Sequence, residues 1–152
     1  MPSPARVLVV ANRTAVKPAL LAAVRERGDR GQARFHLVVP ASPHGMHRLV
    51  DPEIAGREEA GAWLEDALPI LGEAARSEVT GEVGASDPLA AIMDALHDRG
   101  FDEIIISTLP RRYSRWLRVD LPSKAHGLGL PVTHVEMTDS AVEREAAAIA
   151  VR

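Results

Sequence analysis

Short, continuous apolar runs alternate along the chain with segments that have helical periodicity. Each run has the β-branched and aliphatic composition of a strand that is buried on both faces of a sheet. The expected strands are Arg6–Ala11, Phe35–Val39, Glu78–Val83, Glu103–Ser107 and Val132–Val135. Strands that are separated by helices imply right-handed crossovers. The pattern therefore predicts an α/β domain with one parallel sheet covered by helices on both faces.

Two helices are predicted in the first half of the chain. Apolar residues recur at helical spacing from position 16, and Gly28 is expected to end that helix. Residues Arg57–Ala75 form a second amphipathic pattern, in which Pro69 is expected to kink the helix or split it in two. Between the second strand and this helix, the prolines and glycines of Ala41–Gly56 predict a long irregular loop.

A third helix is predicted with clear signals at both ends. Asp87 can cap its free amides, Pro88 suits its first position, and Gly100 is expected to end it. After the last strand, Ser140 and Glu143 have the spacing of a capping box, which favours a short helix in the alanine-rich tail. The expected organisation is one domain over residues 1–137, followed by a tail over residues 138–152.

Composition narrows the classes of protein that fit. The chain has 152 residues, 46% of them hydrophobic, which is ordinary for one globular domain. Its net charge of -3 argues against steering towards nucleic acid or an anionic membrane. The absence of cysteine excludes disulfides, thiolate metal sites and a cysteine nucleophile. No apolar stretch approaches the roughly 18 residues of a membrane span. These features predict a cytoplasmic protein with no membrane or nucleic-acid partner.

The topology selects a candidate site before any chemistry is considered. In open α/β sheets, ligands bind outside the carboxyl ends of the strands, where the strand order reverses. Four segments should meet there: Asn12–Thr14, Ala41–His47, Gly84–Asp87 and Ser107–Arg118.

At these segments the chain resembles the universal stress protein family. The resemblance rests on the long loop after the second strand, on Ser86-Asp87-Pro88, and on Gly-Leu-Pro-Val before the last strand. It implies a three-layer, Rossmann-like (HUP-type) sandwich of the adenine nucleotide alpha hydrolase-like group. The implied sheet has five parallel strands in the order 3-2-1-4-5. It also implies a homodimer that forms through the closing strand, Val132–Val135, which would otherwise be an uncovered sheet edge.

The ATP-binding signature of that family, G-x-x-G-x9-G-[ST], is absent. Its positions fall on Ser107, Pro110, Asp120 and Leu121. Pro110 has no amide hydrogen, and Asp120 puts a carboxylate where a phosphate should bind. We expect the Asp120 side chain to cap the helix that starts there. The family's acidic residue after the first strand is also missing, and Asn12 stands there with Arg13. The sequence thus predicts that ATP is not held in the family's usual way.

Arginines supply a different route to an anion. Arg111, Arg112, Arg115 and Arg118 cluster after the fourth strand, and guanidinium groups bind phosphate or carboxylate through paired donors. The alternative interpretation is a solvated basic face that forms salt bridges with nearby acids. Both remain open here, and nucleic-acid contact is a third, weaker interpretation. The candidate crevice residues are Asn12, Arg13, Thr14, Ser107, Thr108, Arg111, Arg112, Arg115 and Asp120.

No catalytic or metal-binding residue is predicted. His44 and His47 lack a third ligand at a recognisable spacing. Ser107, Thr108 and Ser114 lack the elbow and triad partners of a hydrolase nucleophile. The leading hypothesis is a small binding or regulatory protein with no certain cofactor, and the alternative is a switch or weak ATPase. In the alternative, the arginine-rich turn binds ATP or another phosphate-bearing ligand in place of the glycine motif.

Overall fold

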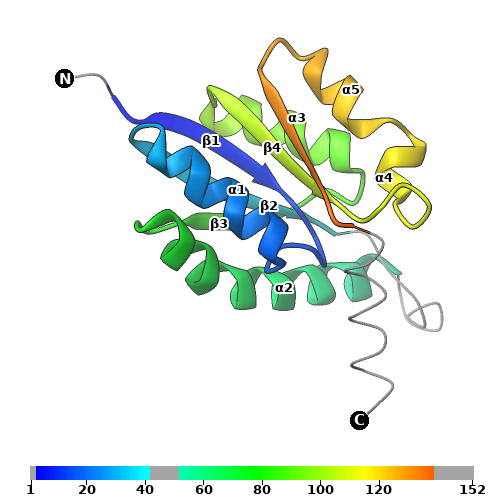
Figure 1. Cartoon of the computed structure of the whole chain (residues 1–152). Helices are drawn as coiled ribbons and strands as arrows, with labels where there is room; N and C mark the ends of the chain where they lie inside the picture. Colours follow the sequence, from blue (N-terminus) through cyan, green and yellow to red (C-terminus); the bar gives the residue numbers. More distant parts are fainter. Residues whose placement is uncertain (1–2, 42–51, 139–152) are drawn as a thin grey trace.

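The computed structural model of the chain describes residues 3–41 and 52–138, and it has one five-stranded sheet (Figure 1). All neighbouring strands are parallel, and their order is β3-β2-β1-β4-β5. The strands are β1 (Ala5–Val10), β2 (Ala33–Pro40), β3 (Thr80–Gly84), β4 (Glu103–Thr108) and β5 (Val132–Glu136). The predicted fold class and strand order are confirmed.

Helices cover both faces of the sheet, which gives three layers (Figure 1). One layer contains α1 (Pro18–Asp29) and α2 (Pro52–Ala75). The other contains α3 (Pro88–Arg99), α4 (Arg115–Arg118) and α5 (Leu121–His126). None of the described helices is long and apolar enough to cross a membrane.

The central strand contributes alternate side chains to two separate cores. Val7 and Val9 of β1 pack with the α1 and α2 layer. Leu8 and Val10 pack with α3, α5 and Trp116 on the other face. All four β1 side chains are fully buried. Burial on both faces explains why the strand is a continuous apolar run instead of an alternating one.

Two predicted helix boundaries are wrong. α1 continues through Gly28 to Asp29, since a glycine in the last turn costs only about 1 kcal/mol relative to alanine. α2 already begins at Pro52, so the predicted loop is shorter on that side, and its residues 42–51 lie outside the described part. α2 is not split at Pro69. Pro69 is exposed, so water can hydrogen-bond the carbonyl group that loses its helical partner.

The predicted signals of the third helix are confirmed. The Ala90 amide donates to Asp87 Oδ2 at 3.0 Å, Pro88 occupies the first turn, and Gly100 follows the last residue with φ of 71°. Between β4 and β5 the chain forms the two short helices α4 and α5. The predicted tail helix, with Ser140 and Glu143, lies outside the described residues.

Candidate functional site

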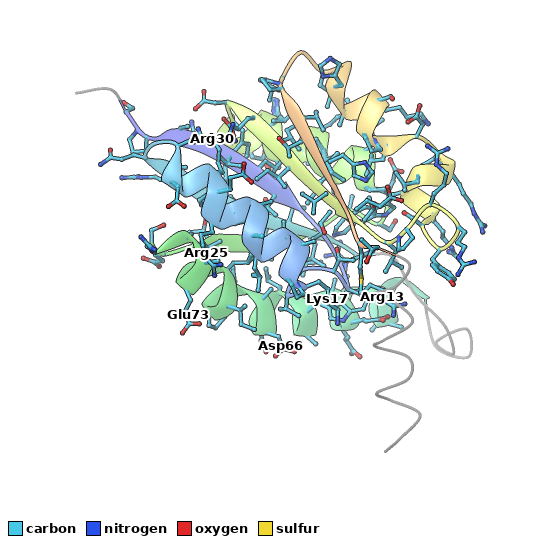
Figure 2. All side chains as sticks on the ribbon, viewed as in Figure 1. Arg13, Lys17, Arg25, Arg30, Asp66 and Glu73 are labelled. Atoms are coloured by element: carbon cyan, nitrogen blue, oxygen red, sulfur yellow. The ribbon has the colours of Figure 1, made fainter. Side chains whose placement is uncertain are left out.

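A crevice of about 230 Å³ lies at the carboxyl ends of β1 and β4. Ligand pockets more often have volumes of about 300 to 1,000 Å³. The residues that line it are Asn12, Arg13, Pro88, Thr108, Leu109, Tyr113, Ser114, Arg115, Trp116 and Val119. Four of the predicted site residues thus border one space: Asn12, Arg13, Thr108 and Arg115. Figure 2 shows Arg13 near Lys17, at the end of the molecule where α1 begins.

Two further predicted residues, Thr14 and Ser107, are buried beside this edge of the sheet. Their hydroxyl oxygens lie 2.7 Å apart, and one hydroxyl donates to the other. Thr14 is 1% exposed and Ser107 is 3% exposed. Because water does not reach them, each hydroxyl relies on the other as its partner. This pair ties the segment after β1 to the end of β4.

Thr108 makes the next link, from β4 to the edge strand. Its side-chain oxygen lies 2.8 Å from Nε2 of His134 in β5. Its carbonyl oxygen accepts a hydrogen bond from the Met137 amide at 2.9 Å. His134 is exposed as a residue, but partial burial of its ring lowers its pKa, and the Glu136 carboxylate opposes that change. A neutral His134 therefore fixes the end of β5 against Thr108.

The backbone amides of the turn after β4 are largely used within the chain. The Arg111 amide donates to Glu136 Oε1 at 2.9 Å. The amides of Tyr113 and Ser114 donate to the carbonyls of Pro110 and Arg111. Further along, the Leu117 amide donates to Ser114 Oγ at 3.3 Å, and the Asp120 amide donates to the Leu117 carbonyl. A phosphate cradle needs several amides that are aimed at one point and free to donate. This turn instead satisfies its own amides.

Asp120 differs from its expected role. Its side chain makes no capping hydrogen bond, so the predicted cap of α5 is wrong. The residue has φ of 55° and ψ of 48°, the left-handed region, and its carbonyl accepts from the Lys124 amide. An N-cap residue needs extended backbone to turn its side chain towards the helix amides. The left-handed backbone at Asp120 prevents this, although it is the conformation that a glycine adopts most easily.

The arginines of the turn are exposed, but they do not act as one cluster. Arg115 borders the crevice, whereas Arg111, Arg112 and Arg118 are not among its lining residues. The Arg112 guanidinium lies over the Tyr113 ring, 4.8 Å from its centroid. Within residues 3–41 and 52–138, neither Arg111, Arg115 nor Arg118 forms an ion pair with a carboxylate. The described residues therefore give these three arginines no salt-bridge partner.

Two residues of this edge, Glu136 and Val119, were not predicted. Glu136, which accepts from the Arg111 amide, lies opposite Thr108 in the β4–β5 register. Placing β5 beside β4 and counting residues along both strands would have brought Glu136 to this edge. Val119, which is 50% exposed, forms part of the crevice wall. No sequence signal marks it, because it follows the last residue of a four-residue helix.

Comparisons with known proteins place this geometry in a structural context. No protein-family model matches the chain, and no curated protein matches its sequence. Solved structures do match. A protein of the universal stress protein family from Burkholderia pseudomallei has a TM-score of 0.61 at 19% identity, covering 88% of this chain and 98% of that one. A universal stress protein in complex with cAMP gives 0.58 at 14% identity, covering 90% and 100%.

A third match is the universal stress protein from Archaeoglobus fulgidus in complex with dAMP. Its TM-score is 0.55 at 21% identity, and the match covers 89% of this chain and 99% of that chain. The matches cover almost the full length of all three structures. At identities of 14% to 21%, this likeness is evidence about the fold alone. The chain therefore has the fold of the universal stress proteins.

Proposed function

We propose that this protein is a small binding or regulatory protein of the universal stress protein type, and that it does not hold ATP in that family's usual way. The observation that carries the proposal is the state of the turn after β4. Its amides donate to Glu136, to Ser114 and to carbonyls of the turn itself. Pro110 has no amide hydrogen to offer. A triphosphate would have to break several of these hydrogen bonds before it could bind there.

A small anion or a nucleoside monophosphate is the second candidate. Arg13, in the segment after β1, and Arg115, the first residue of α4, both border the crevice, and both are exposed. Two guanidinium groups can replace backbone amides as phosphate donors. Two proteins of the same fold are described in complex with cAMP and with dAMP. The volume of about 230 Å³ suits such a ligand better than a nucleoside triphosphate. In this form the protein would be a switch, with Arg13 and Arg115 sensing the anion.

Calorimetry with ATP, dAMP, cAMP and orthophosphate tests both candidates. We expect no submicromolar ATP binding, and any dAMP or cAMP binding should weaken about tenfold or more in R13Q/R115Q, which removes two charge-assisted donors. R118Q is the matched control, because Arg118 is exposed in the same turn but outside the crevice lining. Submicromolar ATP binding that R13Q/R115Q abolishes would overturn the main proposal. Measurable ATP hydrolysis by the wild type, lost in the same variant, would favour a weak ATPase.

The proposal includes a cytoplasmic homodimer that forms through β5. This strand is the last in the sheet order, and β4 is its neighbour in the described sheet. Thr133 and His134 are exposed on it. An edge strand of this kind presents backbone groups that a second copy can pair with. Sedimentation should show a dimer for the wild type and for S123K on exposed α5, but a monomer for T133K. A dimer that survives T133K would place the interface elsewhere.

A further inference from the structure

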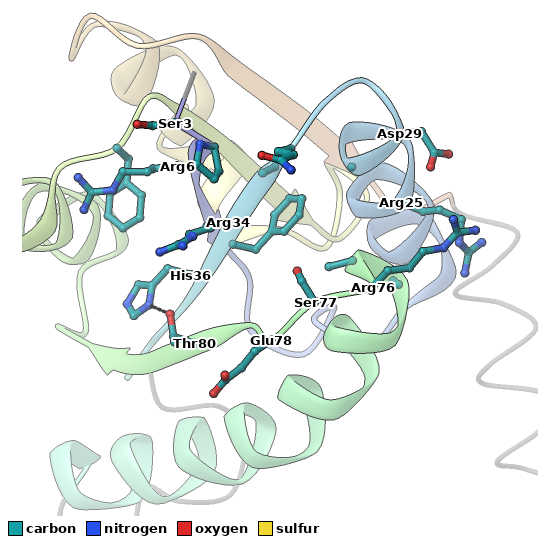
Figure 3. A pocket seen from close by; sticks show the side chains of 18 of the residues that line it. Ser3, Arg6, Arg25, Asp29, Arg34, His36, Arg76, Ser77, Glu78 and Thr80 are labelled. Carbon is teal, nitrogen blue, oxygen red and sulfur yellow. Dashed lines mark hydrogen bonds between the residues drawn. The ribbon is translucent and has the colours of Figure 1, made fainter. Parts of the chain in front are cut away.

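A larger hollow lies at the opposite edge of the sheet, where the strands begin (Figure 3). It has a volume of about 1190 Å³. The starts of β1, β2 and β3 line it together with the final turns of α1 and α3 and the segment that leaves α2. It shares no residue with the crevice at the carboxyl edge. α1 runs from one site to the other, with Lys17 near its start and Arg25 near its end (Figure 2).

The lining of this hollow is strongly basic, although the whole chain has a net charge of -3. Five arginines from five different segments border it, against two carboxylates, those of Asp29 and Glu78. The arginines are Arg6, Arg25, Arg34, Arg76 and Arg99. Positive charge that converges from separate parts of the chain on one concave surface focuses an electrostatic field there.

One of the five arginines, Arg6, has a clear structural task, and Arg99 takes part in it through its backbone carbonyl. The Arg6 guanidinium donates to the Arg99 carbonyl at the end of α3, and it lies over the Phe101 ring at 5.7 Å from the centroid. The buried His36 ring also stacks on Phe101, with 5.9 Å between the ring centroids. Nδ1 of His36 is hydrogen-bonded to Thr80 Oγ1 at 2.7 Å. These contacts tie β1, β2, β3 and the end of α3 together along one wall of the hollow. The Arg6 guanidinium also offsets the partial negative charge at the carbonyl end of α3.

Three further arginines of the lining, Arg25, Arg34 and Arg76, are exposed and have no such task. In the part of the chain that the structure describes, none of their side chains forms a hydrogen bond or an ion pair. Arg25 and Arg76 lie on the same side of the hollow in Figure 3, where the ends of α1 and α2 meet. A Cβ at Gly28 would lie 3.9 Å from the Ala75 carbonyl oxygen, which shows how closely these ends approach.

Arg34 extends the basic surface across the edge of the sheet. It is two residues before His36 on β2, so the two side chains share the face that α3 covers. Arg25 and Arg76 come from the opposite helical layer. A ligand that contacts all three must therefore span the amino edge of the sheet. Its length has to exceed that of a single phosphate group.

We propose that this hollow binds a multivalent phosphate anion, meaning a small molecule with two or more phosphate groups along its length. Guanidinium groups bind phosphate through paired donors, and Arg25, Arg34 and Arg76 supply three such groups at separated points. Three helices end at this edge, and their partial negative charges disfavour a single anion. Only a ligand that engages several arginines at once overcomes that opposition. The volume of about 1190 Å³ leaves room for one.

Calorimetry with inorganic tripolyphosphate, at low and at moderate salt, tests the proposal on the full chain. We expect binding that weakens about tenfold or more in R34Q/R76Q, because two charge-assisted contacts are lost. R25Q alone should weaken tripolyphosphate binding by a smaller factor. It replaces the double variant in the test if R34Q/R76Q does not fold. R30Q is the matched control, since Arg30 is exposed at the end of α1 but outside the hollow lining. Orthophosphate should bind much more weakly than tripolyphosphate.

Several results would overturn the proposal. One is the absence of heat from tripolyphosphate with the wild type. Another is an equal loss in R30Q, which would mean non-specific charge attraction. A third is a loss that follows R13Q/R115Q, which would place the anion in the carboxyl-edge crevice. Tighter binding of a glutamate-rich peptide than of tripolyphosphate would identify a surface for acidic proteins instead. R13Q/R115Q and R34Q/R76Q change opposite edges of the sheet, so each proposed site can be refuted without affecting the other.

Discussion

Removal of the hydroxyl pair between Thr14 and Ser107 tests how the crevice edge is held together. T14V replaces a hydroxyl with a methyl group of similar size, and S107A removes the partner hydroxyl. Each single substitution leaves the other hydroxyl in place, at 1% or 3% exposure and without the contact at 2.7 Å. The double variant removes both hydroxyls and leaves no unsatisfied polar atom of this pair.

The expected free energies follow from that difference. A buried hydroxyl left without a partner costs about 1–3 kcal/mol, whereas the net contribution of an ordinary hydrogen bond is about 0.5–1.5 kcal/mol. T14V and S107A should therefore each lower the free energy of unfolding by about 1–3 kcal/mol. T14V/S107A should cost less than the sum of the two, because neither hydroxyl is then stranded. In a domain of this size, 1 kcal/mol corresponds to a shift in Tm of about 2–4 °C.

A double-mutant cycle by urea unfolding measures this coupling. Wild type, both single variants and the double variant are compared at constant m-value, so that a midpoint change reports stability. S123A is the control, since Ser123 is exposed and its loss should stay within about 0.5 kcal/mol. If the two single losses add up to the double loss, the hydroxyls do not depend on each other. That outcome would refute the argument that this pair holds the loop after β1 to β4.

Three further predictions concern other parts of the molecule. D120G should raise the free energy of unfolding by up to about 1 kcal/mol, since glycine adopts the left-handed conformation without the strain of a side chain. A lower free energy of unfolding in urea would contradict this. E103Q should cost about 1–2 kcal/mol, because Arg27 binds both oxygens of Glu103 at 2.6 and 3.1 Å, and an unchanged Tm would contradict it. Burial lowers the pKa of His36 and of His134, so the unfolded state binds more protons and stability should fall as pH drops below about 6.5. H36Q/H134Q should flatten that dependence in pH-resolved thermal unfolding.

The inner strands β1, β2 and β4 were predictable because most of their residues are buried between two helical layers. Val7 to Val10 are buried on alternate faces, which required the unbroken apolar run that the sequence displays. The first helix end was not predictable from Gly28, because the helix tolerates a glycine in its last turn. The entry into α2 was missed for a related reason. Pro52 and Gly56 suggest a loop locally, but Ala55 and Ala60 are buried and packing extends the helix.

The position of the candidate crevice was predictable from the sequence, but the contacts around it were not. Topology brought Asn12, Arg13, Thr108 and Arg115 to one crevice, as the strand-end rule requires. The pairing of Thr14 with Ser107 and the contact of Glu136 with the Arg111 amide depend on three-dimensional neighbours. The sequence distances involved are 93 and 25 residues, so no local spacing reveals them. The hollow at the amino edge was not predictable, because its arginines come from five separate segments that carry no motif.

Asp120 shows how packing can impose a backbone conformation that its residue type disfavours. The backbone there keeps the left-handed conformation, with φ of 55°, at the position where the related signature has a glycine. A conformation that costs a non-glycine residue roughly 1 kcal/mol persists only where the surrounding chain imposes it. Here α4, α5 and the buried Leu121 fix the path. Packing thus sets the conformation of this turn. D120G would introduce the residue that tolerates this conformation best, and it would remove the carboxylate. If D120G also admitted a phosphate, the occupied amides of the turn would not be the main obstacle, and the proposed function would have to be revised.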